Sequence, residues 1–129
     1  MMNTLTFENL DLACAIAGKK IAAKPSKELE NLVTNAIAVL EEQGIHALFL
    51  FLKTRGGSAA NNVNKELYEF LKATPEQAPM LSDNADIFTS REPLANDLDK
   101  LLLARDLVRQ TLVYARYHAR APQKSEVQT

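Results

Sequence analysis

Four arginines near the end of the chain are spaced so that one helix would place them in a single row. They are Arg105, Arg109, Arg116 and Arg120, at intervals of four, seven and four residues. At about 100° per residue, a helix confines them to a stripe roughly 60° wide. The guanidinium group is a planar fork of donors that fits phosphate oxygens. This arginine stripe therefore predicts contact with a nucleic-acid backbone, which carries phosphates at regular intervals.

The other side of the same helix is apolar in the sequence. It bears Leu103, Leu107, Thr111, Ala115 and His118, with Tyr114 beside them. We expect that side to be buried and the arginine stripe to face solvent. Asp106 is the one acid between Arg105 and Arg120, so the helix itself neutralises little of the charge. The pattern leaves an alternative open, because arginine stripes on amphipathic helices are often solvated faces without a ligand.

Further basic residues could extend a phosphate track beyond the last helix. Lys19 and Lys20 lie near the end of the first predicted helix, and Lys53 and Arg55 close the central one. A cation in the last turn of a helix also offsets the negative end of the helix dipole. These four residues are therefore predicted as additional nucleic-acid contacts, with the dipole as the alternative explanation.

Residues that could carry enzyme chemistry are few. The histidines and the cysteine show no metal-ligand spacing and are predicted to be core residues: His46, His118 and Cys14. Gly56-Gly57 lacks the Gly-Lys-Ser/Thr continuation of a phosphate loop. Asp97 and Asp99 would need a third carboxylate to hold magnesium. The sequence predicts a protein that is not an enzyme and that has no catalytic residue, metal or cofactor.

Length, charge and cysteine content restrict the class of protein. A chain of 129 residues with 47% apolar residues can form one domain with a real core. The net charge of −1 means that nucleic-acid binding must come from local charge segregation or from an assembly. One cysteine excludes an internal disulfide and fits a reducing cytoplasm. The N-terminus lacks a signal-peptide pattern and no apolar run could cross a bilayer, so we predict a cytoplasmic protein.

Helical periodicity and capping signals predict an all-α fold. We expect helices over about 7–23, 27–42, 45–54, 63–73 and 93–121, with Thr6 and Ser26 capping the first two. Gly44 should form a left-handed cap or a kink. We expect 56–62 to be a polar loop and 74–92 a long connection with a short helix near Ile87 and Phe88. The fold is predicted as a single-domain bundle of five or six helices over 1–121, followed by a polar, disordered tail over 122–129.

Two segments resemble a known family. Gln43-Gly44-Ile45, followed by Ala47-Leu48-Phe49 and Phe51, resembles the Asn-Gly-Leu segment and Ala-Leu-Ala-Phe helix of the small helical subunit of type III-B CRISPR effector complexes. Val39-Leu40-Glu41-Glu42 fits the aliphatic pair that precedes this glycine. The last helix matches the family's Tyr-Arg pair, apolar centre, aromatic and closing basic residue through Arg105, Leu107, Thr111, Leu112, Tyr114, Tyr117 and Arg120.

The resemblance covers roughly residues 10–121 and implies a function. It implies a non-catalytic subunit that stacks in several copies beside a repeating backbone subunit holding the guide RNA, and that lines the channel for target RNA. Arg105 and Arg120 are carried over from the family, whereas Arg109 and Arg116 come from the spacing of the stripe. The chain departs from the family where it often has a proline (Ile37), a tyrosine (Ala104) and a Thr-x-Glu (Val108 and Gln110).

The sequence leaves a second function open. A helical protein-interaction adaptor with no nucleic-acid role would have the same composition and helical pattern. Its arginine stripe would be solvated or would meet acidic patches on a protein. In either case we expect no membrane contact and a monomer when the chain is isolated.

Overall fold

The structure is a computed structural model that describes residues 9–75, 80 and 98–128, with side chains up to residue 121 in the last helix. The described residues form helices and no strand, which confirms the predicted all-α, single-domain bundle. The helices are α1 (Leu10–Ile21), α2 (Lys27–Gln43), α3 (Ile45–Arg55), α4 (Gly57–Ala73) and α6 (Leu98–Gln128). The short helix predicted near residues 87 and 88 lies outside the described residues.

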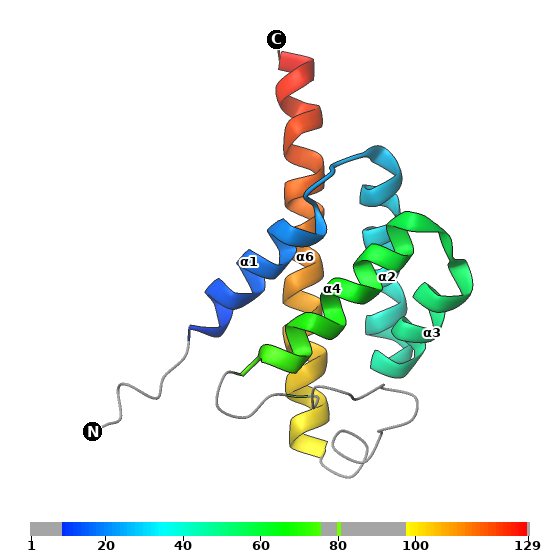
Figure 1. The fold of residues 1–129 in the computed structure, drawn as a ribbon, viewed down its shortest axis with the longest axis vertical. Coiled ribbons are helices and arrows are strands. Elements are labelled where there is room, and N and C mark those ends of the chain that lie inside the picture. The colour runs from blue at the N-terminus through cyan, green and yellow to red at the C-terminus, as the bar shows by residue number, and fades with distance from the viewer. Residues whose placement is uncertain (1–8, 76–79, 81–97, 129) are drawn as a thin grey trace.

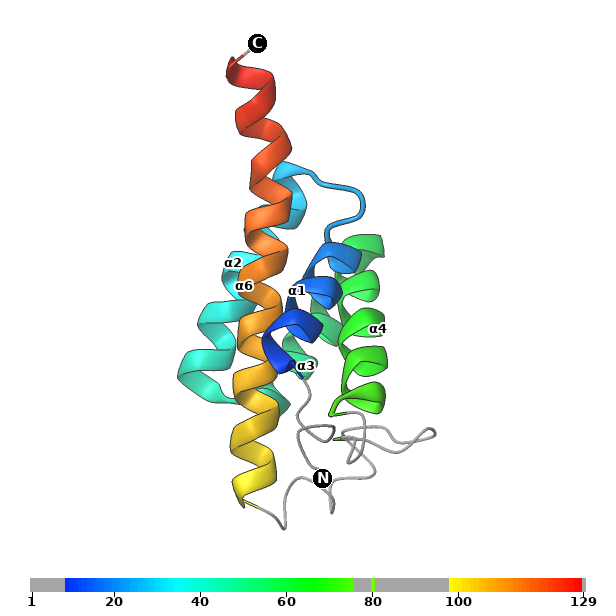
Figure 2. The same cartoon turned by 90° about the vertical axis from the view of Figure 1, so that its left-hand side faces the viewer.

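The longest helix, α6, runs the full height of the molecule, and α1 and α2 pack against it (Figure 1). Figure 2 shows these two helices on either side of α6, with α4 beyond α1. The hairpin of α3 and α4 closes the bundle against α1 and α2. The largest side chains of the core, each less than 2% exposed, come from every helix: Ile21, Leu32, Leu40, Leu48, Phe49, Leu52, Leu67, Leu71 and Leu112.

Side-chain caps define where the first two helices begin. The Asn9 side chain accepts a hydrogen bond of 2.9 Å from the backbone N–H of Leu12, so α1 begins at Leu10. The predicted start at residue 7 and its cap Thr6 lie outside the described residues. Ser26 accepts from the N–H of Leu29 at 3.0 Å, which confirms it as the cap of α2. Both caps satisfy a donor that the first turn of a helix leaves free.

Two glycines make the sharp turns between consecutive helices. Gly44 has φ 99° and ψ −178° between α2 and α3. The predicted interruption at this glycine is confirmed, but its ψ is extended and not that of the left-handed helical cap. Gly56 has φ 67° and ψ −175° between α3 and α4. The predicted polar loop over 56–62 is wrong, because α4 begins at Gly57 directly after that turn. Ala60 is 1% exposed, so burial against the core holds this weakly helical segment in the helix.

A third glycine lets two helices approach closely. A Cβ atom placed on Gly18 of α1 would lie 2.6 Å from Cβ of Tyr114 and 2.8 Å from the backbone nitrogen of Ala115, both in α6. Nearby, the Tyr114 hydroxyl donates to the Asp11 carboxylate at 2.8 Å, which raises the pKa of Tyr114. The contact between α1 and α6 therefore combines a close approach of the two helices at Gly18 with a hydrogen bond between Tyr114 and Asp11.

The last helix is longer than the sequence predicted. We predicted an end at residue 121, whereas the backbone of α6 continues to Gln128 through the segment predicted as a disordered tail. A proline inside a helix removes one backbone hydrogen bond and crowds the carbonyl four residues earlier, so Pro122 favours an end at this point. The Gln, Lys and Glu residues that follow it favour helices. Among the described helices, none combines the length and the apolar character needed to span a membrane.

Candidate nucleic-acid interface

The arginine stripe of α6 borders α2, so the predicted solvent-facing row is only partly correct. Arg109 is exposed, whereas Arg105, Arg116 and Arg120 are half-buried. Nε of Arg109 lies 2.7 Å from Oε2 of Glu41, and Nε of Arg120 lies 2.7 Å from Oε2 of Glu30. Both glutamates belong to α2. Two of the four positive charges of the stripe are thus paired with carboxylates of this second helix.

The two ion pairs mark the two ends of one antiparallel interface. Glu30 and Glu41 are eleven residues apart, and so are Arg109 and Arg120. Eleven residues make about three helical turns, a rise of roughly 16 Å. The same register therefore satisfies both pairs, and it fixes how α2 and α6 lie along each other.

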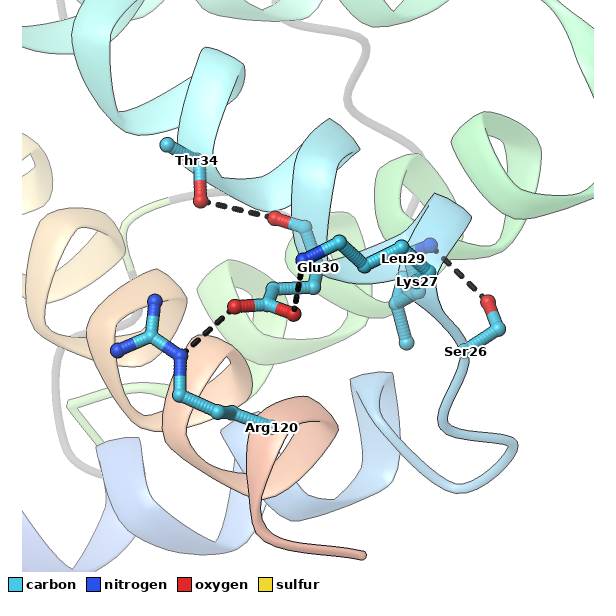
Figure 3. A network of polar contacts seen from close by, with 6 residues as sticks. All are labelled: Ser26, Lys27, Leu29, Glu30, Thr34 and Arg120. Carbon is cyan, nitrogen blue, oxygen red and sulfur yellow. Dashed lines mark hydrogen bonds and ion pairs between the residues drawn. The ribbon is translucent and has the colours of Figure 1, made fainter. Parts of the chain in front are cut away.

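Glu30 is the more deeply placed of the two acids. Figure 3 shows its contacts with Arg120 and Lys27. Its side chain is 9% exposed, and its second carboxylate oxygen lies 3.5 Å from Nζ of Lys27. The Thr34 hydroxyl donates to the Glu30 carbonyl at 2.9 Å, which completes the network within α2. The hydrogen bond from Arg120 lowers the pKa of Glu30, outweighing the opposing effect of desolvation. Arg120 is therefore a structural partner of this carboxylate.

Arg105 contacts a backbone carbonyl, whereas Arg109 and Arg120 contact carboxylates. One of its terminal guanidinium nitrogens donates to the backbone carbonyl of Glu41 at 2.9 Å. That carbonyl belongs to the last turn of α2, where the helix leaves acceptors without partners. Arg105 thus acts as a C-terminal cap for a helix other than its own.

Two arginines keep part of their donor capacity toward solvent. The side chain of Arg109 is 47% exposed, and that of its partner Glu41 is 46% exposed. Arg116 is half-buried, and within the described part of the chain its buried Nε has no hydrogen-bond partner. The side chain of Arg120 is also 39% exposed, but its Nε is engaged with the largely buried Glu30. Arg109 and Arg116 are therefore the arginines that we expect to meet a phosphate most readily.

The four additional cations are all exposed but do not lie on α6. Lys19 and Lys20 are in the last turn of α1, and Lys53 and Arg55 are in the last turn of α3. All four positions agree with the helix-dipole explanation. Nothing in the described structure tests whether they contact RNA, so that role stays a prediction.

The residues considered for enzyme chemistry are dispersed. Cys14 is buried, as predicted, and its thiol lies 3.5 Å from the Leu107 carbonyl; burial raises its pKa. His46 and His118 are half-buried, so the prediction that both are core residues is wrong. Asp97 lies outside the described residues, and Asp99 is exposed at the start of α6. The described residues contain no group of three His, Cys, Asp or Glu side chains that could hold a metal ion.

Comparison with known proteins adds no assignment. No family model matches the chain, and neither does any curated protein or solved structure.

Proposed function

We propose that this chain is a non-catalytic small subunit of a cytoplasmic CRISPR ribonucleoprotein effector similar to the type III-B complexes. In such a complex it would line the channel that holds the guide and target RNA. Its partners would be these RNAs, a repeating backbone subunit and further copies of itself. Base pairing to the guide would supply sequence specificity, so the subunit would need only backbone contacts.

The contact between Arg105 and the end of α2 carries this proposal. The two segments that resemble the family are separated by more than fifty residues in the sequence. The bond from Arg105 to the Glu41 carbonyl spans 64 positions and joins the start of one segment to the other. It ends three residues before Gly44, the glycine on which the resemblance centres. The matching residues thus belong to one structural unit, which supports treating them as a single family pattern.

The proposal changes which arginines are expected to meet RNA. Arg105 and Arg120, the two carried over from the family, are engaged with α2 and are expected to act on the fold. Arg109 and Arg116 remain as candidate RNA contacts. An exposed ion pair such as Arg109–Glu41 contributes only about 0–1 kcal/mol, so a phosphate can replace the carboxylate at modest cost.

One observation favours the alternative of a protein-interaction adaptor. Three of the four stripe arginines already have a hydrogen-bond partner on α2, so the stripe offers less positive charge to RNA than its sequence suggests. An adaptor of this kind would function without guide or target RNA. The two functions therefore differ in whether RNA accompanies the protein.

Co-purification tests the proposed function. The chain is tagged in its native host, and the recovered proteins and RNA are identified. We expect a guide RNA together with large RNA-binding subunits, and nuclease treatment before capture should reduce their recovery. Recovery of protein partners with no RNA, unchanged by nuclease, would support the adaptor instead.

A further inference from the structure

A groove runs between the end of α1 and the side of α6. It has a volume of about 620 Å³ and is lined by Ile16, Lys19, Lys20, Ala22, Ala23, Pro25 and His118. Most of these are apolar side chains or the stems of lysines. The groove lies where the end of α1 meets α6.

The apolar lining of the groove continues along the outer face of α1. Ile16 is 50% exposed, and Leu12, one helical turn earlier, is 53% exposed. Residues four apart share one side of a helix, so Leu12 lengthens the apolar surface by roughly 6 Å. Large apolar side chains of this exposure in one row beside a groove are typical of a binding surface.

The charge of the groove is positive. Two lysines and a histidine line it, and no acidic side chain does. Within the described part of the chain, neither Lys19 nor Lys20 forms an ion pair. An adjoining groove, between the end of α1 and the starts of α2 and α4, shares Lys20, Ala23 and Pro25 with it but also contains Glu28 and Glu66. The groove at Ile16 is thus the one whose charge complements an acidic ligand.

The lining favours a protein segment over a nucleic acid. Single-stranded RNA is held by stacking of bases on aromatic rings together with contacts to the phosphates. The groove has no Phe, Tyr or Trp in its lining, and its apolar part is aliphatic. Aliphatic side chains of a partner would fill such a groove, and carboxylates beside them would meet the lysine ammonium groups.

We propose that this α1–α6 groove, extended by Leu12, binds a short apolar segment that carries acidic residues and belongs to another protein subunit of the effector complex. This inference rests on the proposed function for the identity of the complex. It assigns subunit docking to α1, including Lys19 and Lys20 in place of their predicted RNA contacts, and it leaves RNA contact by Arg109 and Arg116 on α6 unchanged.

The test compares the same kind of substitution at exposed aliphatic residues beside the groove and on another helix. Ile16→Gln and Leu12→Gln remove apolar surface from the groove, and Leu50→Gln makes the same kind of change on α3, where Leu50 is 52% exposed. Each full-length variant is co-expressed with the other subunits and the guide RNA. In parallel, each variant is purified alone, and its affinity for the complex assembled without this subunit is measured. We expect Ile16→Gln to weaken binding roughly tenfold, Leu12→Gln to weaken it less, and Leu50→Gln to leave it unchanged.

A second arm tests the charge of the segment. Lys19→Gln with Lys20→Gln should also weaken docking, and added salt should reduce the difference from the wild type because it screens exposed charges. Circular dichroism and melting temperature confirm that each variant is folded.

Normal docking of the Ile16 and lysine variants overturns the inference while the proposed function stands. If docking is normal but target-RNA affinity falls, the groove is an RNA surface and the inference is again wrong. If the wild-type chain does not join the complex, the proposed function fails and this inference fails with it.

Discussion

Nε of Arg120 on α6 lies 2.7 Å from Oε2 of Glu30 on α2, at a carboxylate that is only 9% exposed. A charge in such a position is costly when its partner is removed. The pair lies eleven residues from the more exposed pair of Arg109 and Glu41, in the same antiparallel register. Arg120 therefore fixes the position of α6, whereas Arg109 can exchange its partner.

The stability of the folded protein should decrease at acidic pH, where Glu30 becomes protonated. The hydrogen bond from Arg120 lowers the pKa of Glu30 in the folded protein, so the unfolded chain binds a proton more readily. This stabilisation is complete above the ordinary glutamate pKa of about 4.3 and is lost as the pH falls through the lower folded value. We expect melting temperature to fall with pH in this range for the wild type, and to fall less for Glu30→Gln. Parallel curves for the two proteins would exclude Glu30 as the titrating group.

Replacing Arg105 with alanine should destabilise the protein without unfolding it. The change leaves the Glu41 carbonyl in the last turn of α2 without its 2.9 Å donor. A hydrogen bond of this kind contributes about 0.5–1.5 kcal/mol. Urea denaturation measures the loss, and Arg105→Lys should recover part of it because lysine keeps a donor and a charge. A full loss in the lysine variant would mean that packing of the guanidinium matters more than the bond.

Gly18→Ala should destabilise the contact between α1 and α6. The added Cβ would lie 2.6 Å from Cβ of Tyr114 and 2.9 Å from the carbonyl oxygen of Thr111, so the helices would have to separate. Overpacking of this kind costs about 1–3 kcal/mol. The sign of the effect is diagnostic, since glycine to alanine in an open helical position stabilises by roughly 0.5–1 kcal/mol. A higher melting temperature for Gly18→Ala would contradict the close approach.

Gly44→Val should destabilise the turn between α2 and α3. A Cβ on Gly44 would meet no atom within 4 Å, so the cost comes from the backbone at φ 99° and ψ −178°. This region is almost restricted to glycine, and other residues lose about 1–3 kcal/mol there. Gly44→Asn should not rescue stability, because asparagine tolerates the left-handed helical region but not this value of ψ. Thermal melts of both variants test this, and a wild-type melting temperature for either would rule out the strained turn.

Several parts of the fold could be predicted from the sequence because they depend on local chemistry. Ser26 precedes a periodic apolar segment, and a serine in that place caps a helix. Gly44 interrupts an otherwise helical pattern, which indicates a turn with positive φ. The start of α4 was missed because residues 57–62 are weakly helical alone, and their helix depends on burial of Ala60 in the tertiary structure.

The orientation of the arginine stripe could not be predicted from α6 alone. The sequence pattern predicts an apolar side centred on Leu107 and Ala115, whereas Val108 and Leu112 are also fully buried. On a helix Leu112 lies only about 20° from Arg105, so the stripe borders the core instead of opposing it. Glu30 and Glu41, on another helix, pair with two of its four arginines. Their eleven-residue spacing, equal to that of Arg109 and Arg120, was the available signal.

Arg109 should contribute to RNA affinity in a way that Arg120 does not. If Arg109 exchanges Glu41 for a phosphate, each lost contact should flatten the slope of log affinity against log salt by about 0.7 for single-stranded RNA. We expect Arg109→Ala, measured in the assembled complex, to weaken target binding similarly for unrelated guide sequences, since phosphate contacts carry no base code. Glu41→Gln should strengthen binding slightly by removing the competing carboxylate. Arg120→Ala should lower the melting temperature and leave the salt slope unchanged, because its guanidinium is held by the largely buried Glu30.

An unchanged slope for Arg109→Ala in a complex that assembles normally would show that the exposed pair is only a surface salt bridge. The phosphate contacts would then have to come from other cations, with Arg116 the next residue to substitute.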